Sequence, residues 1–313
     1  MAEAVRITKM KDEDYPGLYQ CADVISIHSQ KVYLILQRAY LGSLILGSVL
    51  GSFTAFGSAV VNIWLYTAMA IILTLGLLLL WIIRARQDDK AWFDGRAIAE
   101  SIKTATWRFM MKAQPFQADE AVEDCFIDEL RGVRSARSSF EKHLAAAINP
   151  YTSAITDVMW QIRSASLKER KGFYTESRVR DQKSWYSHKA KTNAKMGARW
   201  FWTTVALQAV AVVTAIIQAV AGGLGFKIVP VLATCAAAVT AWSQTKRYDE
   251  LAQSYALAAQ ELEELESIAN NLKNDDDFPQ LVEQVEETIS REHTMWCARR
   301  DVRLSGRSPD RKQ

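Results

Sequence analysis

The 313-residue sequence lacks charge over unusually long stretches. No Asp, Glu, Lys, Arg or His occurs from Ala39 to Ile83, from Trp200 to Phe226, or from Ile228 to Thr245. Buried helices of soluble proteins seldom stay uncharged for so long, whereas a bilayer core requires about 20 apolar residues in helical form. The missing charge therefore disfavours a soluble core and predicts membrane spans.

The sequence also lacks the residue spacings that are typical of catalytic, metal-binding or phosphate-binding sites. The four cysteines show no paired spacing, which disfavours a disulfide framework or a metal site. The four histidines are scattered without Cys or carboxylate partners at ligand spacing, and no phosphate loop or zinc-hydrolase pattern occurs. We therefore predict no catalytic, cofactor-binding or metal site, no enzyme activity and no nucleic-acid partner.

The first uncharged run is too long for a single span. Its 45 residues would form a helix of about 67 Å, against a hydrocarbon core of about 30 Å. The run must fold back near "FTAFGSAVVN", which gives spans at about 39–56 and 61–83. A second hairpin turns at "AGGLGFKIVP", with spans at about 200–221 and 226–245. The predicted fold is an all-α integral membrane protein with two transmembrane helical hairpins.

Basic residues flank all four spans on one side. The two turns carry one charge between them, Lys227. The positive-inside rule then places both termini and the middle segment in the cytoplasm. The flanking residues are Lys31, Arg38, Arg84, Arg86, Lys189, Lys191, Lys195, Arg199, Lys246 and Arg247.

The polar segments carry helical periodicity and are expected to form a cytoplasmic bundle. One helix begins near Pro16 and runs into the first span, a second covers Ala91–Phe116 and ends at Pro115, and a third fits Ala118–Ile148. From Leu251 to Leu272, apolar residues repeat by four and three, which is typical of a coiled-coil seam. A last helix starts at Pro279. The seam predicts a homo-oligomer.

Charge is distributed unevenly between the polar segments. Residues 84–199 carry a net charge of +7 and residues 246–313 carry −5. One interpretation is that these segments pack on each other, within or between subunits. The other is that both are solvated faces, with the basic excess serving topology.

Three groups of residues are candidates for function. Gly47, Gly51 and Ala55 form a small-residue stripe for helix packing. An uncharged polar stripe lies on spans three and four and either lines a pore or joins helices. Its members are Thr204, Gln208, Gln218, Thr240 and Gln244. Arg96, Glu100 and Lys103 share one helix face and form either a ligand site or, in the favoured interpretation, a structural ion-pair network.

Three segments carry a resemblance to a known family. "WFDGRAIAESIKTATWRFMMKAQPF" and "YTESRVRDQKSWYSHKAKTNAKMG" resemble the cytoplasmic flanks of the SLATT families, the SMODS- and SLOG-associating two-transmembrane effector domains of bacteria, and "ISREHTMWCARR" resembles their usual ending. The resemblance implies two tandem units, at 1–116 and 173–304. A helical connector at 117–172 and a disordered tail at 305–313 complete the expected organisation.

The resemblance also implies a function that periodicity alone does not show. The family is expected to form membrane pores in bacterial conflict and anti-phage systems. The chain would then be a pore-forming or membrane-perturbing effector, gated through its cytoplasmic helices by a sensor protein or signal nucleotide. The alternative is a non-conducting membrane scaffold that recruits a cytoplasmic partner. A membrane enzyme is disfavoured because no nucleophile or paired acid lies at the membrane face.

Overall fold

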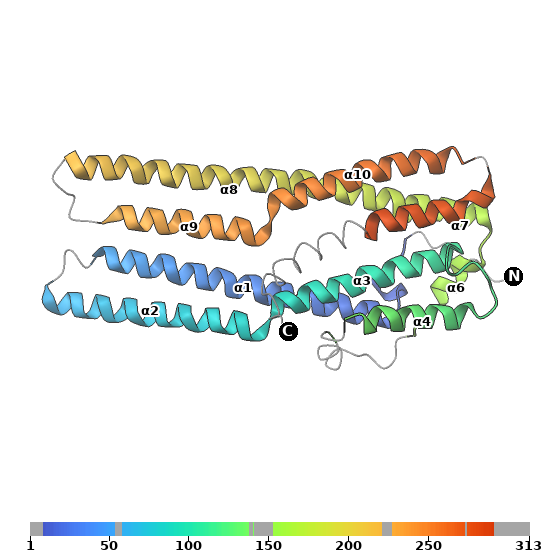
Figure 1. Ribbon diagram of the computed structural model, residues 1–313, viewed down its shortest axis with the longest axis horizontal. Helices are drawn as coiled ribbons and strands as arrows, with labels where there is room; N and C mark the ends of the chain where they lie inside the picture. Colours follow the sequence, from blue (N-terminus) through green and yellow to red (C-terminus); the bar gives the residue numbers. More distant parts are fainter. Residues whose placement is uncertain are drawn as a thin grey trace, which may run out of the picture. The chain divides into compact units, whose positions relative to one another are not determined.

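A computed structural model describes residues 9–53, 58–137, 140, 153–220, 227–272 and 274–290 (Figure 1). Every regular element in these residues is helical, which confirms the all-α prediction. The elements are η1 (Asp12–Asp14), α1 (Gly17–Phe53), α2 (Ala59–Arg86), α3 (Asp88–Met111), α4 (Val122–Ser135), α6 (Asp157–Ser164), α7 (Leu167–Tyr174), the π-helix η3 (Thr175–Arg180), α8 (Asp181–Val220), α9 (Ile228–Lys246), α10 (Tyr248–Asn270) and η4 (Asp275–Asp277). Residues 278–290 form a further helix.

Four stretches are long and apolar enough to cross a membrane. They are Gly17–Phe53, Ala59–Met111, Leu167–Val220 and Ile228–Asn270. The four-span prediction is therefore confirmed, and the helix that begins beside Pro16 continues without a break into the first span. The predicted small residue Ala55, residues 54–57 and 221–226 of the two predicted turns, and the tail 305–313 lie outside the described residues.

Two of these stretches contain a left-handed residue at equivalent places. Gln87, between α2 and α3, has φ 51° and ψ 35°, and its N–H donates to the carbonyl of Ile83. Arg247, between α9 and α10, has φ 51° and ψ 43°, and its N–H donates to the carbonyl of Ser243. A left-handed residue that returns a hydrogen bond to the last turn is a common way to end a helix. Each hairpin thus ends in the same kind of joint.

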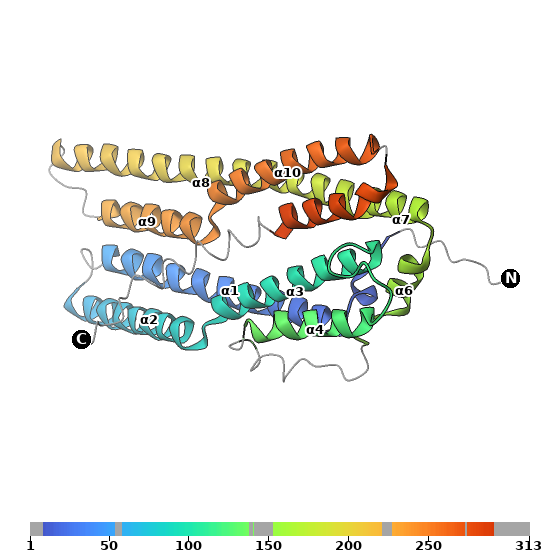
Figure 2. The ribbon, with the colours of Figure 1, turned by 45° about the vertical axis from the view of Figure 1, so that its right-hand side comes forward.

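The chain forms two compact units. The polar unit comprises Met1–Ser29, Asp89–Lys189 and Ser254–Gln313, and the membrane unit comprises Gln30–Asp88 and Ala190–Gln253. In the membrane unit, α1 runs beside α2 and α8 runs beside α9, as two hairpins (Figures 1 and 2).

Glycines and small side chains set the helix contacts of the membrane unit. A Cβ at Gly47 would lie 2.9 Å from Cδ2 of Leu73, and one at Gly76 would lie 2.5 Å from Oγ of Ser43. These contacts bring α1 and α2 together. Leu41, Ala238 and Trp242 form a small apolar cluster between α1 and α9.

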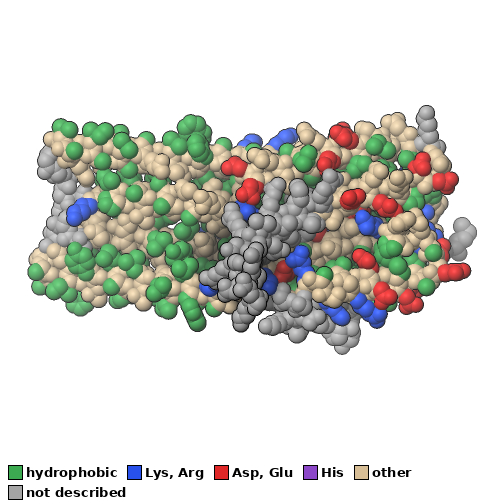
Figure 3. Space-filling view, viewed as in Figure 1, with side chains coloured by type: hydrophobic (Ala, Val, Ile, Leu, Met, Phe, Trp, Pro, Cys, Tyr) green, Lys and Arg blue, Asp and Glu red, His purple; other side chains and the backbone are tan. Residues whose placement is uncertain are grey.

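Much of the remaining surface of the membrane unit is apolar. Hydrophobic side chains gather over α2, α8 and α9 on the face shown in Figure 3. Trp64, Trp81 and Trp202 are 71%, 68% and 65% exposed. An apolar surface of this kind suits contact with lipid and explains how long helices that are hardly buried can be stable in a bilayer.

The polar unit has a large aromatic core. Helix α3 passes through it, with Ile98, Ile102 and Trp107 almost fully buried. Phe109 packs against Phe116, Phe126 and Trp160, with ring centroids 5.0–6.0 Å apart. Aromatic pairs in this range add to the free energy of burial.

Two predicted helix boundaries in the polar unit are wrong. Helix α3 ends at Met111, before Pro115, because Lys112 adopts φ 55° and turns the chain out of the helix. The helix predicted over Ala118–Ile148 is observed only as Val122–Ser135. Its N-cap residue, Ala121, has φ 54°, so the chain enters the helix later than the periodicity indicates. Residues 141–148 lie outside the described part of the chain.

The four-three seam of α10 is covered by the same chain. Ala258, Leu262 and Ala269 are buried in the core of the polar unit, and Leu265 and Leu272 pack against that core. The periodicity is therefore explained by packing within one chain, and it gives no independent support for a coiled coil between copies.

Candidate functional site

A buried ion pair lies at the centre of the polar unit. The Arg178 guanidinium donates from Nε to Oε1 of Glu286 over 2.9 Å and from Nη2 to Oε2 over 2.6 Å. The side chains are 1% and 0% exposed. A buried charge is tolerated when it is both paired and hydrogen-bonded, and the two parallel bonds meet both conditions.

Two neutral groups complete the hydrogen bonding of the Glu286 carboxylate. Tyr174 donates its hydroxyl to Oε1 over 3.1 Å, and Thr104 donates its hydroxyl to Oε2 over 3.0 Å. Each carboxylate oxygen thus accepts two hydrogen bonds. We call Thr104, Tyr174, Arg178 and Glu286 the buried polar centre.

The π-helix η3 presents the arginine of this centre. It directly follows Tyr174, the last residue of α7, and directly precedes Asp181, the first residue of α8. A π-helix makes i→i+5 hydrogen bonds, so its turn holds one more residue than an α-helical turn. Single π turns are rare and occur frequently at functional sites. Arg178 and Val179 point into the core, whereas Arg180 is exposed.

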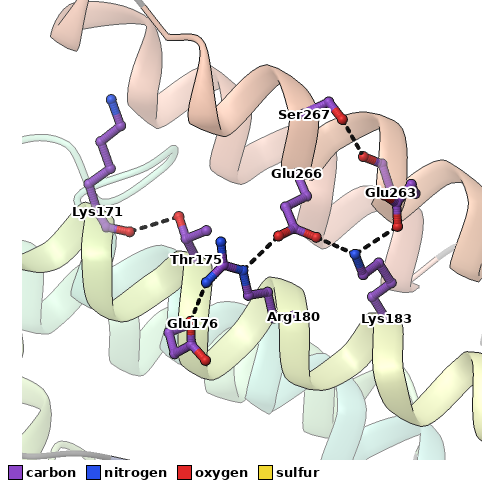
Figure 4. Close-up of polar contacts among 8 residues, drawn as sticks. All are labelled: Lys171, Thr175, Glu176, Arg180, Lys183, Glu263, Glu266 and Ser267. Carbon is purple, nitrogen blue, oxygen red and sulfur yellow. Dashed lines mark hydrogen bonds and ion pairs between the residues drawn. The ribbon is translucent and has the colours of Figure 1, made fainter.

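A second polar group lies on the outer side of the same turn (Figure 4). Arg180 donates to Glu176 and to Glu266, over 2.6 Å in each case. Lys183 donates to Glu263 over 2.7 Å and also to Glu266. We call these five residues the outer ladder. It joins η3 and the start of α8 to α10.

The buried polar centre and the outer ladder decide between the two interpretations of the charge asymmetry. Basic residues of the segment 84–199 pair with acidic residues of 246–313, including Lys171 with Asp275 at 3.9 Å. The prediction that the two segments pack on each other is confirmed, with both partners in one chain.

The electrostatics favour fixed charges over proton transfer. Hydrogen bonds from Lys183 and Arg180 lower the pKa of Glu266. Burial by itself lowers the pKa of Arg178, but the Glu286 carboxylate outweighs burial and the pKa is raised. Burial, reinforced by Glu286, raises the pKa of Tyr174 well above its usual value. Each of these groups keeps one protonation state near neutral pH, which suits a structural or switching element better than a general acid or base.

Two other arginines hold the end of α3. Arg163 donates to the carbonyls of Phe109, Phe116 and Ala118 over 2.6–3.2 Å and to the Asp119 carboxylate over 2.7 Å. Arg170 donates to the Met111 carbonyl over 2.8 Å. Phe109 and Met111 lie in the last turn of α3, whose carbonyl groups lack i+4 partners within the helix, whereas Phe116, Ala118 and Asp119 belong to the segment that follows it.

The predicted network on α3 is only partly assembled. Arg96 and Glu100 form an ion pair at 3.5 Å. Lys103 instead lies over the rings of Tyr15 and Tyr19, with Nζ 5.6 Å and 6.0 Å from the ring centroids. Burial lowers the pKa of Lys103, although Glu100 opposes the shift.

An acidic group of the N-terminal segment faces the same part of α3. Burial and the charge of Asp12 raise the pKa of Asp23, with Arg96 and Lys103 among the groups that contribute to its electrostatic surroundings. This side of α3 is thus a contact with η1 and the beginning of α1. The described residues contain no cluster of three His, Cys, Asp or Glu side chains placed to hold a metal ion.

The predicted span residues occupy different environments. Gly47 is buried against Leu73, and a Cβ at Gly51 would lie 3.4 Å from Sδ of Met69, so both face α2. Thr204 and Thr240 donate their hydroxyls to carbonyls four residues earlier in their own helices, at Trp200 and Ala236.

The glutamines of the predicted polar stripe differ in exposure. Gln208 and Gln244 are exposed and Gln218 is half-buried. On α8 the stripe therefore follows the border between the covered and the exposed side of the helix. This position leaves the choice between pore lining and helix contact open.

These features define the class of the protein: an α-helical integral membrane protein with two two-span hairpins and a polar unit centred on a buried ion pair. Residues 16–171 match the SMODS and SLOG-associating 2TM effector domain 3, and residues 174–296 match the SMODS and SLOG-associating 2TM effector domain 1. The chain belongs to the SLATT families and contains two units in tandem, as the sequence resemblance predicted. Neither a curated protein nor a solved structure shows significant similarity to it.

The boundary between the two matches falls just before the π-helix. Thr104 lies in the first match, whereas Tyr174, Arg178 and Glu286 lie in the second. The buried polar centre is therefore built from both SLATT domains. Sequence reasoning missed this centre and the two arginines at the end of α3, because their partners are distant in the chain or are backbone carbonyls that no sequence pattern marks.

Proposed function

We propose that this membrane effector acts as a homo-oligomeric pore in the inner membrane of a bacterial cell, opened through its polar unit during a conflict with phage. A general effector role follows from the family. The pore, the assembly and the gating are our proposal. So are the absence of enzyme activity and the dependence on a sensor protein or signal nucleotide.

The observation that carries the proposal is the side chain of Gln208. It lies in α8, eight residues inside the uncharged run that begins at Trp200, and it is exposed in the membrane unit. Among the described residues its amide has no hydrogen-bond partner, and lipid tails offer none. A neighbouring copy or a water-filled lumen between copies would supply the missing partners.

The chemistry of the stripe suggests weak selectivity. Gln208, Gln218 and Thr204 provide dipoles without fixed charge, and an uncharged lining discriminates poorly between ions. Opening would be coupled to the polar unit through α1 and α8, because each is one continuous helix that begins in that unit and crosses the uncharged run.

A flux assay in liposomes tests the proposal. Wild-type protein should release K⁺ and a small fluorescent anion, whereas Gln208→Leu should reduce the flux several-fold by removing the polar lining. Val212→Leu is the matched control, because Val212 lies one turn further along the exposed side of α8 and is already apolar.

The oligomer mass of the same variants separates the pore from the scaffold. If Gln208 only joins helices, Gln208→Leu should loosen the oligomer by about 0.6 kcal/mol per lost hydrogen bond. The absence of flux from wild-type protein, with or without a lysate from phage-infected cells, would leave the non-conducting scaffold as the function. One contact favours the scaffold. Helices α1 and α9 pack against each other, and Thr234 donates to Ser48 over 3.3 Å, so no channel passes between these two helices within a single chain.

A further inference from the structure

The π-helix η3 is held on two sides by carboxylates from two different helices. On its inner side, Arg178 is bound to Glu286 of the helix 278–290. On its outer side, Arg180 is bound to Glu266 of α10, which also binds Lys183 in the first turn of α8. The π-helical turn 175–180, called the wide turn below, is therefore held by contacts from the C-terminal part of the chain.

A wide turn of this kind has a defined alternative. The i→i+5 pattern is rare in proteins, whereas the same backbone forms i→i+4 hydrogen bonds readily. Without its carboxylate partners, the segment 175–180 would therefore relax to a regular α-helix. The turn would then hold one residue fewer, and the extra residue would become part of the regular helix.

The relaxation would move everything that follows in the same rigid helix. Helix α8 begins at Asp181 and runs without a break to Val220. An α-helix advances 1.5 Å and turns about 100° per residue. If α7 stays in place, each position now occupied by one residue of α8 becomes occupied by the residue before it.

This shift has a specific consequence for the polar stripe. The position of Gln208 would be taken by Leu207, and the position of Gln218 by Ile217. One register of α8 therefore presents amides along this line and the other presents aliphatic side chains. We propose that η3 is a register switch for α8, held in the polar register by Glu286 and Glu266 and released when either carboxylate is withdrawn. Its effect on conduction rests on the proposed pore function.

A spin-label distance within the polar unit tests the switch without reference to conduction. Nitroxides at Ser184 of α8 and Ser267 of α10, both exposed, are introduced into the full chain after its native cysteines are replaced. A turn of about 100° on a helix about 10–12 Å across moves the label at position 184 by about 8 Å.

The release variant is Arg178→Met with Glu286→Gln. It removes the ion pair without leaving one buried charge, and the glutamine carbonyl still accepts from Tyr174 or Thr104. We expect a second distance population in this variant. Glu266→Gln with Glu263→Gln, in the outer ladder, is the second release variant if the first does not fold; it acts away from the buried polar centre and keeps the size of both side chains.

Deletion of Ser177 provides the decisive comparison. It removes one residue from the wide turn, so that a regular helix forms while α7 and α8 keep their places. The release variants should then no longer change the distance. Ser177→Ala, which keeps the chain length, should leave their effect intact.

The outcomes distinguish the switch from the pore. An unchanged distance in both release variants, or the same change with and without Ser177, overturns the switch. A changed distance that depends on Ser177, with an altered liposome flux, supports the switch and the pore together. The same distance change without any flux from wild-type or variant protein supports the switch and refutes the pore.

Discussion

Thr104 donates its hydroxyl to Oε2 of Glu286 over 3.0 Å, although 182 residues separate the two in the chain. The first residue belongs to one SLATT domain and the second to the other. The bond is buried, and its acceptor also holds Arg178 and Tyr174. The two domains therefore share one polar centre and are expected to unfold together.

The contribution of the Thr104–Glu286 hydrogen bond to stability can be measured by substitution. Thr104→Val keeps the shape but removes a donor from a buried carboxylate, so the free energy of unfolding should fall by about 1–3 kcal/mol. Thr104→Ser is the control, because it keeps the hydroxyl. Thermal unfolding in detergent measures both, and equal melting temperatures for the valine and serine variants would contradict the assignment.

The buried ion pair should behave non-additively. Glu286→Leu alone leaves the Arg178 guanidinium buried without a partner and should cost about 3–5 kcal/mol. Arg178→Met combined with Glu286→Leu should recover most of that loss, because apolar replacements of both partners are often tolerated. The test is a double-mutant cycle on thermal or denaturant unfolding; additive losses would show that the two charges are not energetically coupled.

Lys103 should reduce stability at neutral pH. Its pKa in the folded protein lies below the ordinary value of 10.5, chiefly because of burial. Between the folded pKa and 10.5 the unfolded chain binds more protons, so the free energy of unfolding rises with pH across that interval. Lys103→Met removes this half-buried charge and should raise Tm by about 2–4 °C at pH 7, equivalent to about 1 kcal/mol.

The gain from Lys103→Met should shrink as the pH approaches 10. Burial raises the pKa of Tyr15 and Tyr19 above their usual value, so neither phenol ionises in that interval. Lys168→Met, at an exposed lysine, is the control and should leave Tm unchanged at every pH. A gain that does not vary with pH would show that packing, and not charge, is responsible.

Helix α1 should tolerate a larger side chain at Gly42 but not at Gly47, which contacts α2. Gly47→Ile places a branched side chain against Leu73 and should cost about 1–3 kcal/mol through overpacking. Gly42→Ile, on the same helix, is the control because nothing lies within 4 Å of a Cβ there. Unfolding in detergent distinguishes them; equal stability would mean that the hairpin is packed more loosely than the structure shows.

The orientation in the membrane remains a prediction from the basic flanks. Ser58→Cys, at the start of α2, should react with an impermeant thiol reagent added to the periplasmic side, whereas Ser267→Cys on α10 should react only after the cells are opened. Both serines are exposed. Labelling of position 267 in intact cells would reverse the proposed topology.

The sequence could predict what depends on composition over long stretches. Absent charge from Ala39 to Ile83 sufficed for the first two spans, and Pro16 correctly marked the beginning of α1. The charge asymmetry correctly suggested that the basic and acidic segments meet. It did not reveal that Arg178 would be buried and Arg180 exposed, since both are arginines in one short charged segment.

The rest depended on long-range geometry. Arg178 and Arg180 are two residues apart and would point to opposite sides of any helix, but no local pattern in "TESRVR" indicates which of them faces the core or that the turn is a π-helix. Arg163 binds mainly carbonyl groups, which every residue carries, so its role had no sequence signal. Lys103 had the spacing of a helix-surface ion pair but found two tyrosine rings from the N-terminal segment, a contact decided by tertiary packing.

The left-handed residues Gln87 and Arg247 occupy equivalent places in the two tandem domains, so the two joints can be compared with each other. The two domains match different family descriptions, yet each closes its second span with a long polar residue at φ 51°. A side chain in that conformation is disfavoured by roughly 1–2 kcal/mol, and glycine avoids the strain. Gln87→Gly and Arg247→Gly therefore relieve the same backbone strain in both domains, while the second also removes the ion pair between Arg247 and Glu250. A difference in stability larger than the loss of that partly exposed pair would show that the two joints, although alike in backbone conformation, are not equivalent in their surroundings.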